Sequence, residues 1–121
     1  EMQFEDVSER AGIPATENFW GAGAAMGDID NDGDLDLYLT AYDSPNLMLI
    51  NESRDGEPVF VERGKERGAD GKDGTLNASF CDYDRDGDLD LIVGHLLTTT
   101  EICWDPLEDE GLMGRVERLL S

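Results

Sequence analysis

Two acidic runs of nine residues carry most of the potential chemistry of this chain. They read DIDNDGDLD from Asp28 to Asp36 and DYDRDGDLD from Asp82 to Asp90, with aspartate at alternate positions and glycine at position six. Alternate carboxylates that curl around one centre supply hard oxygen ligands, which Ca²⁺ takes at roughly 2.3–2.6 Å. Without a cation, such crowded charges would protonate or move apart. We interpret both runs as calcium loops, one ion each.

The position of each aspartate in its loop suggests its role. We expect side-chain oxygens from positions one, three, five and nine, and a backbone carbonyl from position seven, by analogy with an EF-hand loop. With a water, this set reaches six or seven oxygens, whereas Mg²⁺ requires tighter octahedral geometry. The expected side-chain ligands are Asp28, Asp30, Asp32, Asp36, Asp82, Asp84, Asp86 and Asp90, and the carbonyl ligands are Asp34 and Asp88. The alternative is a solvated acidic loop without metal, and the second copy in the same register counts against it.

The residues around the loops indicate strands. An EF-hand would need a glutamate at position twelve and flanking helices, but position twelve is Leu39 in one loop and Val93 in the other. The segments that follow, LDLYLTAY and LDLIVGHL, show the alternation of a β-strand, and the small or apolar segments that precede them fit buried strands. Each loop is therefore predicted to join the two strands of a hairpin.

The two copies also set the fold class. Asp82 follows Asp28 by 54 residues (82 − 28), and Phe60 follows Phe4 by 56 (60 − 4). A period of this size indicates propeller blades or another repeat array. We expect an all-β fold of two β-propeller-type blades, antiparallel four-stranded sheets of which the second is incomplete. The expected strands are 22–27, 35–41, 46–51 and 59–63, then 76–81, 89–94 and a short one at 101–104.

These motifs resemble the FG-GAP or VCBS repeat of integrin α-subunit-like β-propellers. The matching stretches are FEDVSERAGI (4–13), WGAGAAMGDIDNDGDLDLYLTAY (20–42), PNLMLIN (45–51) and NASFCDYDRDGDLDLIVG (77–94). The resemblance implies calcium binding between two strands of a blade, with the same aspartates as ligands. It does not imply an activity, because such propellers serve adhesion, sugar binding and scaffolding.

The two ends depart from the repeat. Residues 1–19 contain Met2–Ser8, which resembles the fourth strand of a preceding or shared blade, followed by a linker. Residues 20–64 form the first blade and 65–104 the incomplete second one. In 105–121, Asp105 and Pro106 could start a short helix, and an irregular tail is the alternative. Either the chain is part of a longer propeller protein, which we favour, or each copy donates Met2–Ser8 to the next, giving rings or filaments.

Composition and calcium chemistry limit the classes of binding partner and the cellular location that we expect. The chain has 29 acidic and 9 basic residues among 121, a net charge of −20, which disfavours nucleic acid and anionic membranes. No apolar run is long enough to cross a membrane. Weak oxygen-ligand calcium sites fill at extracellular rather than cytosolic calcium concentrations. We therefore expect a secreted or cell-surface location, or a periplasmic one in a bacterium.

Two kinds of covalent modification follow from short patterns. Cys81 and Cys103 either form a disulfide in the second blade or stay buried as thiols. Asn51 and Asn77 each begin an N-glycosylation acceptor pattern. Such patterns also arise by chance. Asn77 begins a predicted strand, where a glycan is less easily accommodated than at Asn51.

The sequence offers no catalytic constellation. The single histidine, His95, follows a strand and is expected to pack or face solvent, and no nucleophile elbow is present. Trp20 and Trp104 could stack on a sugar, but blade cores need aromatic residues too, and core packing is the expectation. We therefore expect a non-enzymatic calcium-binding module for structure, adhesion or assembly, with protein partners or its own copies. The alternative is a carbohydrate-binding, lectin-like propeller module.

Overall fold

The computed structural model describes residues 1–14, 18–72 and 74–95, and within these ranges the regular structure is entirely β. Strands β1 (Gly21–Gly27), β2 (Asp36–Ala41), β3 (Leu47–Asn51) and β4 (Phe60–Glu62) form an antiparallel sheet in the order β1-β2-β3-β4. Strands β5 (Thr75–Cys81) and β6 (Asp90–His95) form a second antiparallel pair. The predicted all-β, blade-like class is confirmed, and the six observed strands lie where the sequence placed them.

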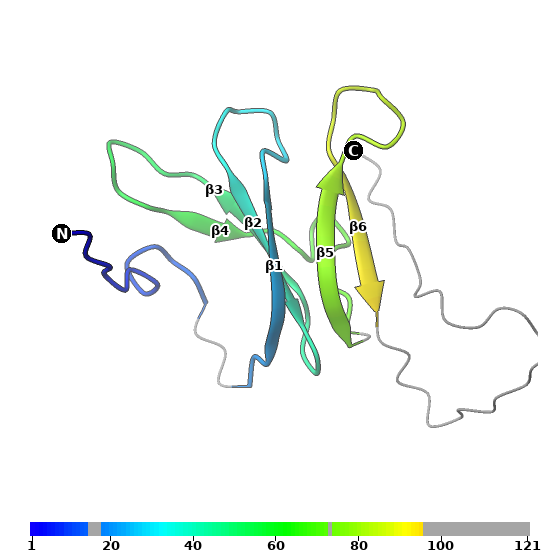
Figure 1. The fold of residues 1–121 in the computed structure, drawn as a ribbon, viewed down its shortest axis with the longest axis horizontal. Helices are drawn as coiled ribbons and strands as arrows, with labels where there is room; N and C mark the ends of the chain where they lie inside the picture. Colours follow the sequence, from blue (N-terminus) through cyan, green and yellow to red (C-terminus); the bar gives the residue numbers. More distant parts are fainter. Residues whose placement is uncertain (15–17, 73, 96–121) are drawn as a thin grey trace, which may run out of the picture.

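The β5–β6 hairpin repeats the β1–β2 hairpin in register. Gly27 pairs with Asp36 at the mouth of the first loop, and Cys81 pairs with Asp90 at the mouth of the second. The register shifts near the opposite end of both hairpins, between Gly21 and Gly23 and between Thr75 and Asn77. Figure 1 shows the two acidic loops at the same end of the molecule, side by side.

Small residues in β1 allow the two sheets to approach each other. β5 packs against β1 and β2. A Cβ atom on Gly23 would lie 2.9 Å from the backbone carbonyl oxygen of Leu76 in β5, closer than a carbon atom can approach without displacement. Gly23 therefore allows β1 to approach β5 closely.

The core lies between the sheets. It consists of buried Tyr38, Met48, Ile50, Ala69, Leu91 and Val93, with Ile29, Ala78 and Phe80 packed against them. Tyr38 of β2 donates its hydroxyl to the carbonyl oxygen of Ala69 at 2.8 Å. Its ring meets that of Phe80 in β5 edge-on, with centroids 6.5 Å apart. Tyr38 therefore joins the first sheet both to the second and to the segment between them.

The N-terminal segment repeats the turn that follows β4. The N–H groups of Ala11, Gly12 and Ile13 donate to the carbonyl oxygens of Val7, Glu9 and Ser8. Fifty-six residues later (67 − 11), those of Arg67, Gly68 and Ala69 donate to Arg63, Lys65 and Gly64 in the same pattern. Gly12 and Gly68 also share a positive φ, 74° and 68°. Residues 4–6 thus occupy the place of β4 in this pattern.

The expected strand at Met2–Ser8 does not form among the described residues of this single chain. Met2 and Phe4 are 84% and 93% exposed. The expected strand at 101–104 and the helix within 105–121 lie outside the described residues. The blade and tail boundaries predicted from the sequence therefore stay predictions.

Candidate metal centre

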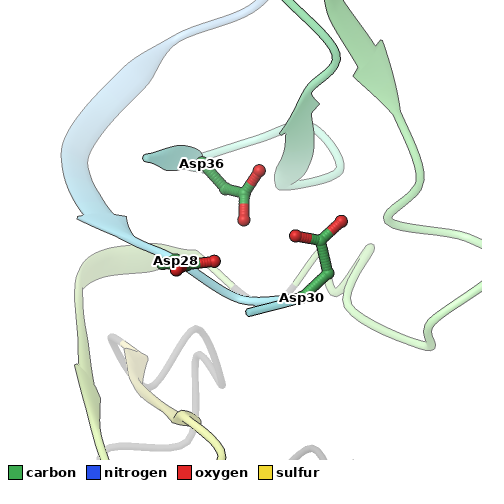
Figure 2. A group of neighbouring side chains, drawn as sticks. All are labelled: Asp28, Asp30 and Asp36. Carbon is green, nitrogen blue, oxygen red and sulfur yellow. The ribbon is translucent and has the colours of Figure 1, made fainter. Parts of the chain in front are cut away.

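Three aspartates of the first loop converge on one point. Carboxylate oxygens of Asp28, Asp30 and Asp36 lie within 4.8 Å of one another. In Figure 2, Asp28 follows β1, Asp30 lies further along the loop, and Asp36 faces both from the start of β2. Asp36 is fully buried and Asp30 is exposed, so the cluster spans the depth of the loop.

Backbone amides hold the loop around these carboxylates. Asp28 accepts the N–H groups of Asp32 and Gly33 through its two oxygens, both at 3.0 Å. Gly33 has a φ of 96°, in the region that glycine tolerates best. Asp32 in turn accepts the N–H of Asp34 at 2.9 Å. The loop therefore folds over its first aspartate, as the glycine at position six predicts.

Asp36 closes the loop at its base. Its Oδ2 accepts the N–H of Ile29 and its Oδ1 accepts the N–H of Asn51 in β3, both at 2.7 Å. Each carboxylate oxygen has a second lone pair, which these hydrogen bonds leave for another partner. The position-nine aspartate can therefore serve the fold and a cation at the same time.

The second loop reproduces this network. Asp82 accepts the N–H groups of Asp86 and Gly87, at 3.1 and 3.2 Å. Asp86 accepts that of Asp88 at 3.0 Å, and Asp90 accepts that of Tyr83 at 2.9 Å. The cluster within 4.8 Å is here made by Asp82, Asp84 and Asp86, all exposed. The two loops thus share their hydrogen bonds but differ in which third carboxylate joins the cluster.

Not every predicted ligand belongs to these clusters. Asp32 and Asp34 of the first loop, and Asp88 and Asp90 of the second, lie outside them. Asp34 and Asp88 were expected to bind through their backbone carbonyls. The carboxylate of Asp88 accepts a hydrogen bond from Asn31 of the other loop, at 2.7 Å. The individual ligand assignments stay predictions.

Electrostatics in the first loop favour a positive partner. Desolvation within the loop, followed by the negative charges of Asp36 and Asp32, raises the pKa of Asp30 above its ordinary value of 3.8. The donor set in both clusters consists of carboxylate oxygens alone. Hard oxygen donors suit Ca²⁺ rather than the thiolate- and imidazole-seeking transition metals. The residues present therefore fit a calcium ion.

The other candidate residues lie outside the two acidic clusters. Asn51 ends β3, and its side-chain amide donates to the carbonyl oxygen of Leu35 at 3.0 Å. Asn77 lies exposed within β5, and half-buried Cys81 ends that strand. Cys103 and Trp104 lie outside the described residues, so the disulfide is a prediction without a described partner.

The expectation that Trp20 packs in the core is wrong. Its side chain is 71% exposed, and its ring meets Tyr42 edge-on with centroids 6.3 Å apart. It directly precedes β1. His95 lies within hydrogen-bond distance of Thr75, 3.2 Å from its Oγ1, and Thr75 accepts an N–H from Asn46 at 2.8 Å. The histidine therefore belongs to a polar network between strands.

The roles of two residues at the site were not predicted from the sequence. Asn51 was singled out as a glycosylation acceptor, yet its backbone N–H anchors Asp36. Asn31 fills a position between aspartates that carries no expected ligand, and its φ of 60° is in the left-handed region where asparagine is enriched. That preference was the available signal for a turn at Asn31. Nothing local to the sequence indicates its contact with the second loop.

Comparison with known proteins places the chain in a family. The family model described as an FG-GAP-like repeat matches residues 28–93, more than half of the chain, from the first aspartate of one loop to the strand after the other. The chain belongs to the FG-GAP-like repeat family. This confirms the resemblance read from the acidic loops and their flanking strands.

A relative in this comparison is much longer. Cartilage acidic protein 1 of Xenopus tropicalis is 34% identical over 70 residues, covering 54% of this chain and 11% of that protein. The chain therefore spans about a tenth of the relative that it matches. Within residues 1–14, 18–72 and 74–95, no helix is both long and apolar enough to cross a bilayer.

Proposed function

We propose that this FG-GAP-like chain is an extracellular calcium-binding module with a structural role in adhesion or assembly. The observation that carries the proposal is the duplication of one carboxylate cradle. Two loops 54 residues apart (82 − 28) each gather three carboxylates and share four backbone-to-carboxylate hydrogen bonds. A cation in each loop would neutralise charges that otherwise repel at the same end of the molecule.

The extracellular location is supported by the chemistry of the proposed sites. Oxygen-ligand sites of extracellular modules work at roughly 10⁻⁴–10⁻³ M calcium, a concentration that the cytosol does not supply. The relative is named for cartilage. The net charge of −20 suits a protein that depends on divalent cations for compact packing.

A non-catalytic role is part of the proposal. His95 is engaged with Thr75 in a network that joins strands. Six aspartates of the loops accept backbone N–H groups: Asp28, Asp32, Asp36, Asp82, Asp86 and Asp90. We therefore assign structural tasks, rather than acid–base chemistry, to His95 and to these aspartates.

Unfolding with and without calcium tests the function. A ligand that binds only the folded chain stabilises it by about 2.7 kcal/mol at a concentration one hundred times its Kd. We expect calcium to raise the denaturant midpoint of the full chain and Mg²⁺ to raise it less, because Mg²⁺ demands six ligands at roughly 2.0–2.1 Å. Identical midpoints in calcium and in chelator would overturn the proposal.

The N-terminal segment supports a proposal about assembly. Because residues 7–13 repeat the turn after β4, we propose that residues 4–6 pair as an outer strand with a blade outside the described residues. That blade belongs either to a longer protein or to a second copy. Sedimentation velocity with calcium separates these: self-association lost in Phe4→Asp supports the second copy, and a monomer at high concentration excludes it.

Exposed Trp20 favours carbohydrate binding as a second candidate function. The exposed indole of Trp20 lies beside Tyr42, and Asn18 and Asp43 line a shallow hollow at the same place. This arrangement combines a stacking surface with polar groups, as small-ligand sites do. Glycan-array binding that Trp20→Ala abolishes would support it. The control is Phe4→Ala, which removes another exposed ring. Absence of glycan binding by the unchanged chain would exclude it.

A further inference from the structure

A side-chain hydrogen bond joins the two acidic loops. The Nδ2 of Asn31 donates to Oδ1 of Asp88 at 2.7 Å, across 57 residues of sequence. Asn31 is position four of the first loop and Asp88 is position seven of the second. We propose that this contact couples the two calcium sites, so that filling one loop strengthens binding at the other. The inference rests on the proposed calcium function and adds regulation to it.

Each partner in the contact is held by its own loop. Asn31 lies next to Asp32, whose N–H binds Asp28, and its backbone is fixed in the left-handed region at φ 60°. Asp88 donates its N–H to Asp86 of the second cluster. An ion that orders either cluster therefore also fixes one end of the contact between the loops.

Packing beneath the loops supports the same coupling. A Cβ atom on Gly27, at the start of the first loop, would lie 3.0 Å from side-chain atoms of both Leu89 and Phe80. Leu89 belongs to the second loop and Phe80 precedes it in β5. The base of one loop is therefore in close contact with the base of the other. The loops are joined both by the hydrogen bond between Asn31 and Asp88 and by this packing.

The coupling has a defined thermodynamic form. When the first ion orders a loop, the second loop docks on a partner already in place and loses less conformational entropy on binding. The effect is reciprocal by necessity. A solvent-exposed hydrogen bond to a charged group contributes modestly, so we expect it to change the coupling by about threefold. Electrostatic repulsion between the two ions opposes this coupling. The repulsion is the same in every variant that binds both ions, so it does not affect their comparison.

The repeat supplies matched controls. Arg85 occupies position four of the second loop, with a φ of 64° that matches the 60° of Asn31. Glycine adopts such a φ without strain and offers no side-chain donor. Asn31→Gly therefore removes the contact, and Arg85→Gly makes the same backbone change in the other loop.

The test is calcium titration by calorimetry on the full chain. The product of the two stepwise association constants, divided by the product of the two single-site constants, gives the coupling factor. Asp82→Ala with Asp84→Ala leaves the first loop alone, and Asp28→Ala with Asp30→Ala leaves the second. The whole set is then repeated with Asn31→Gly and with Arg85→Gly. We expect the factor to fall about threefold with Asn31→Gly and to stay unchanged with Arg85→Gly.

The outcomes separate this inference from the function on which it rests. Two-site binding with the same coupling factor in Asn31→Gly as in the unchanged chain overturns the coupling alone. An equal fall in Arg85→Gly also overturns it, because a general loosening of the loops would then explain the effect. Absence of calcium binding by the unchanged chain overturns the proposed function and the coupling together.

Discussion

Asp36 and Asn51 join the acidic loop to the third strand of its sheet. The Oδ1 of Asp36 accepts the backbone N–H of Asn51 at 2.7 Å, and its Oδ2 accepts that of Ile29 at the same distance. Asp36 is fully buried. The position-nine aspartate is thus a structural acceptor as well as an expected calcium ligand, and removing it should cost stability even without metal.

Asp36→Asn tests this structural role. The amide keeps the shape but replaces one acceptor oxygen by a donor, which must face a backbone N–H. Hydrogen bonds to charged groups contribute about 1.5–3 kcal/mol, so we expect a loss of that size in the free energy of unfolding. Urea denaturation in chelator measures it, with exposed Asp34→Asn as the control. Equal stability of the two variants would contradict a structural Asp36.

The raised pKa of Asp30 predicts pH-dependent calcium binding. Because the folded, metal-free chain raises this pKa above 3.8, the stability that protonated Asp30 contributes is fully present below pH 3.8 and is lost as pH rises through the raised value. Calcium needs the ionised carboxylate. Binding should therefore release protons in this pH window, and affinity should rise with pH.

Calorimetry in buffers with different ionisation enthalpies measures this release. Asp30→Asn should lower the number of protons released per calcium bound, because the titrating group is gone. Asp84→Asn, at the equivalent position of the second loop, should leave the release from the first loop in place. Equal proton release from the unchanged chain and from Asp30→Asn would refute the role of Asp30.

Tyr38 should join the first sheet to the segment between β4 and β5 through its hydroxyl. It is 1% exposed and donates to the carbonyl oxygen of Ala69 at 2.8 Å. Tyr38→Phe leaves that buried carbonyl without this donor, which should lower the free energy of unfolding by about 1–3 kcal/mol. Tyr83→Phe, at a side chain 73% exposed, should change it little. Urea unfolding compares them, and equal losses would argue against the Tyr38 contact.

Local sequence patterns predict most of the fold. The alternation after Asp36 and Asp90 predicts β2 and β6, and glycine at position six predicts the positive φ found at Gly33 and Gly87. These features depend on neighbours within a few residues, and the repeat gives each a second occurrence. The sequence alone therefore predicts the strands and the positions of the two acidic loops.

Contacts between the copies could not be predicted in this way. Asn31 of the first loop donates a hydrogen bond to Asp88 of the second loop, 57 residues away in the sequence. Trp20 was expected in the core, but the chain turns it outward before β1. Both outcomes depend on how two sheets stack, which periodicity within one strand does not determine. The place of Asp36 likewise depends on a contact distant in the sequence, the N–H of Asn51 in the neighbouring strand β3.

Calcium stoichiometry tests the central claim most directly. Calorimetric titration of the full chain should give two calcium ions per chain, and Asp82→Ala should leave one, because Asp82 holds the second loop through the N–H groups of Asp86 and Gly87. Two ions in the unchanged chain and one in the variant would support two calcium cradles. Absence of calcium binding by the unchanged chain would contradict the account.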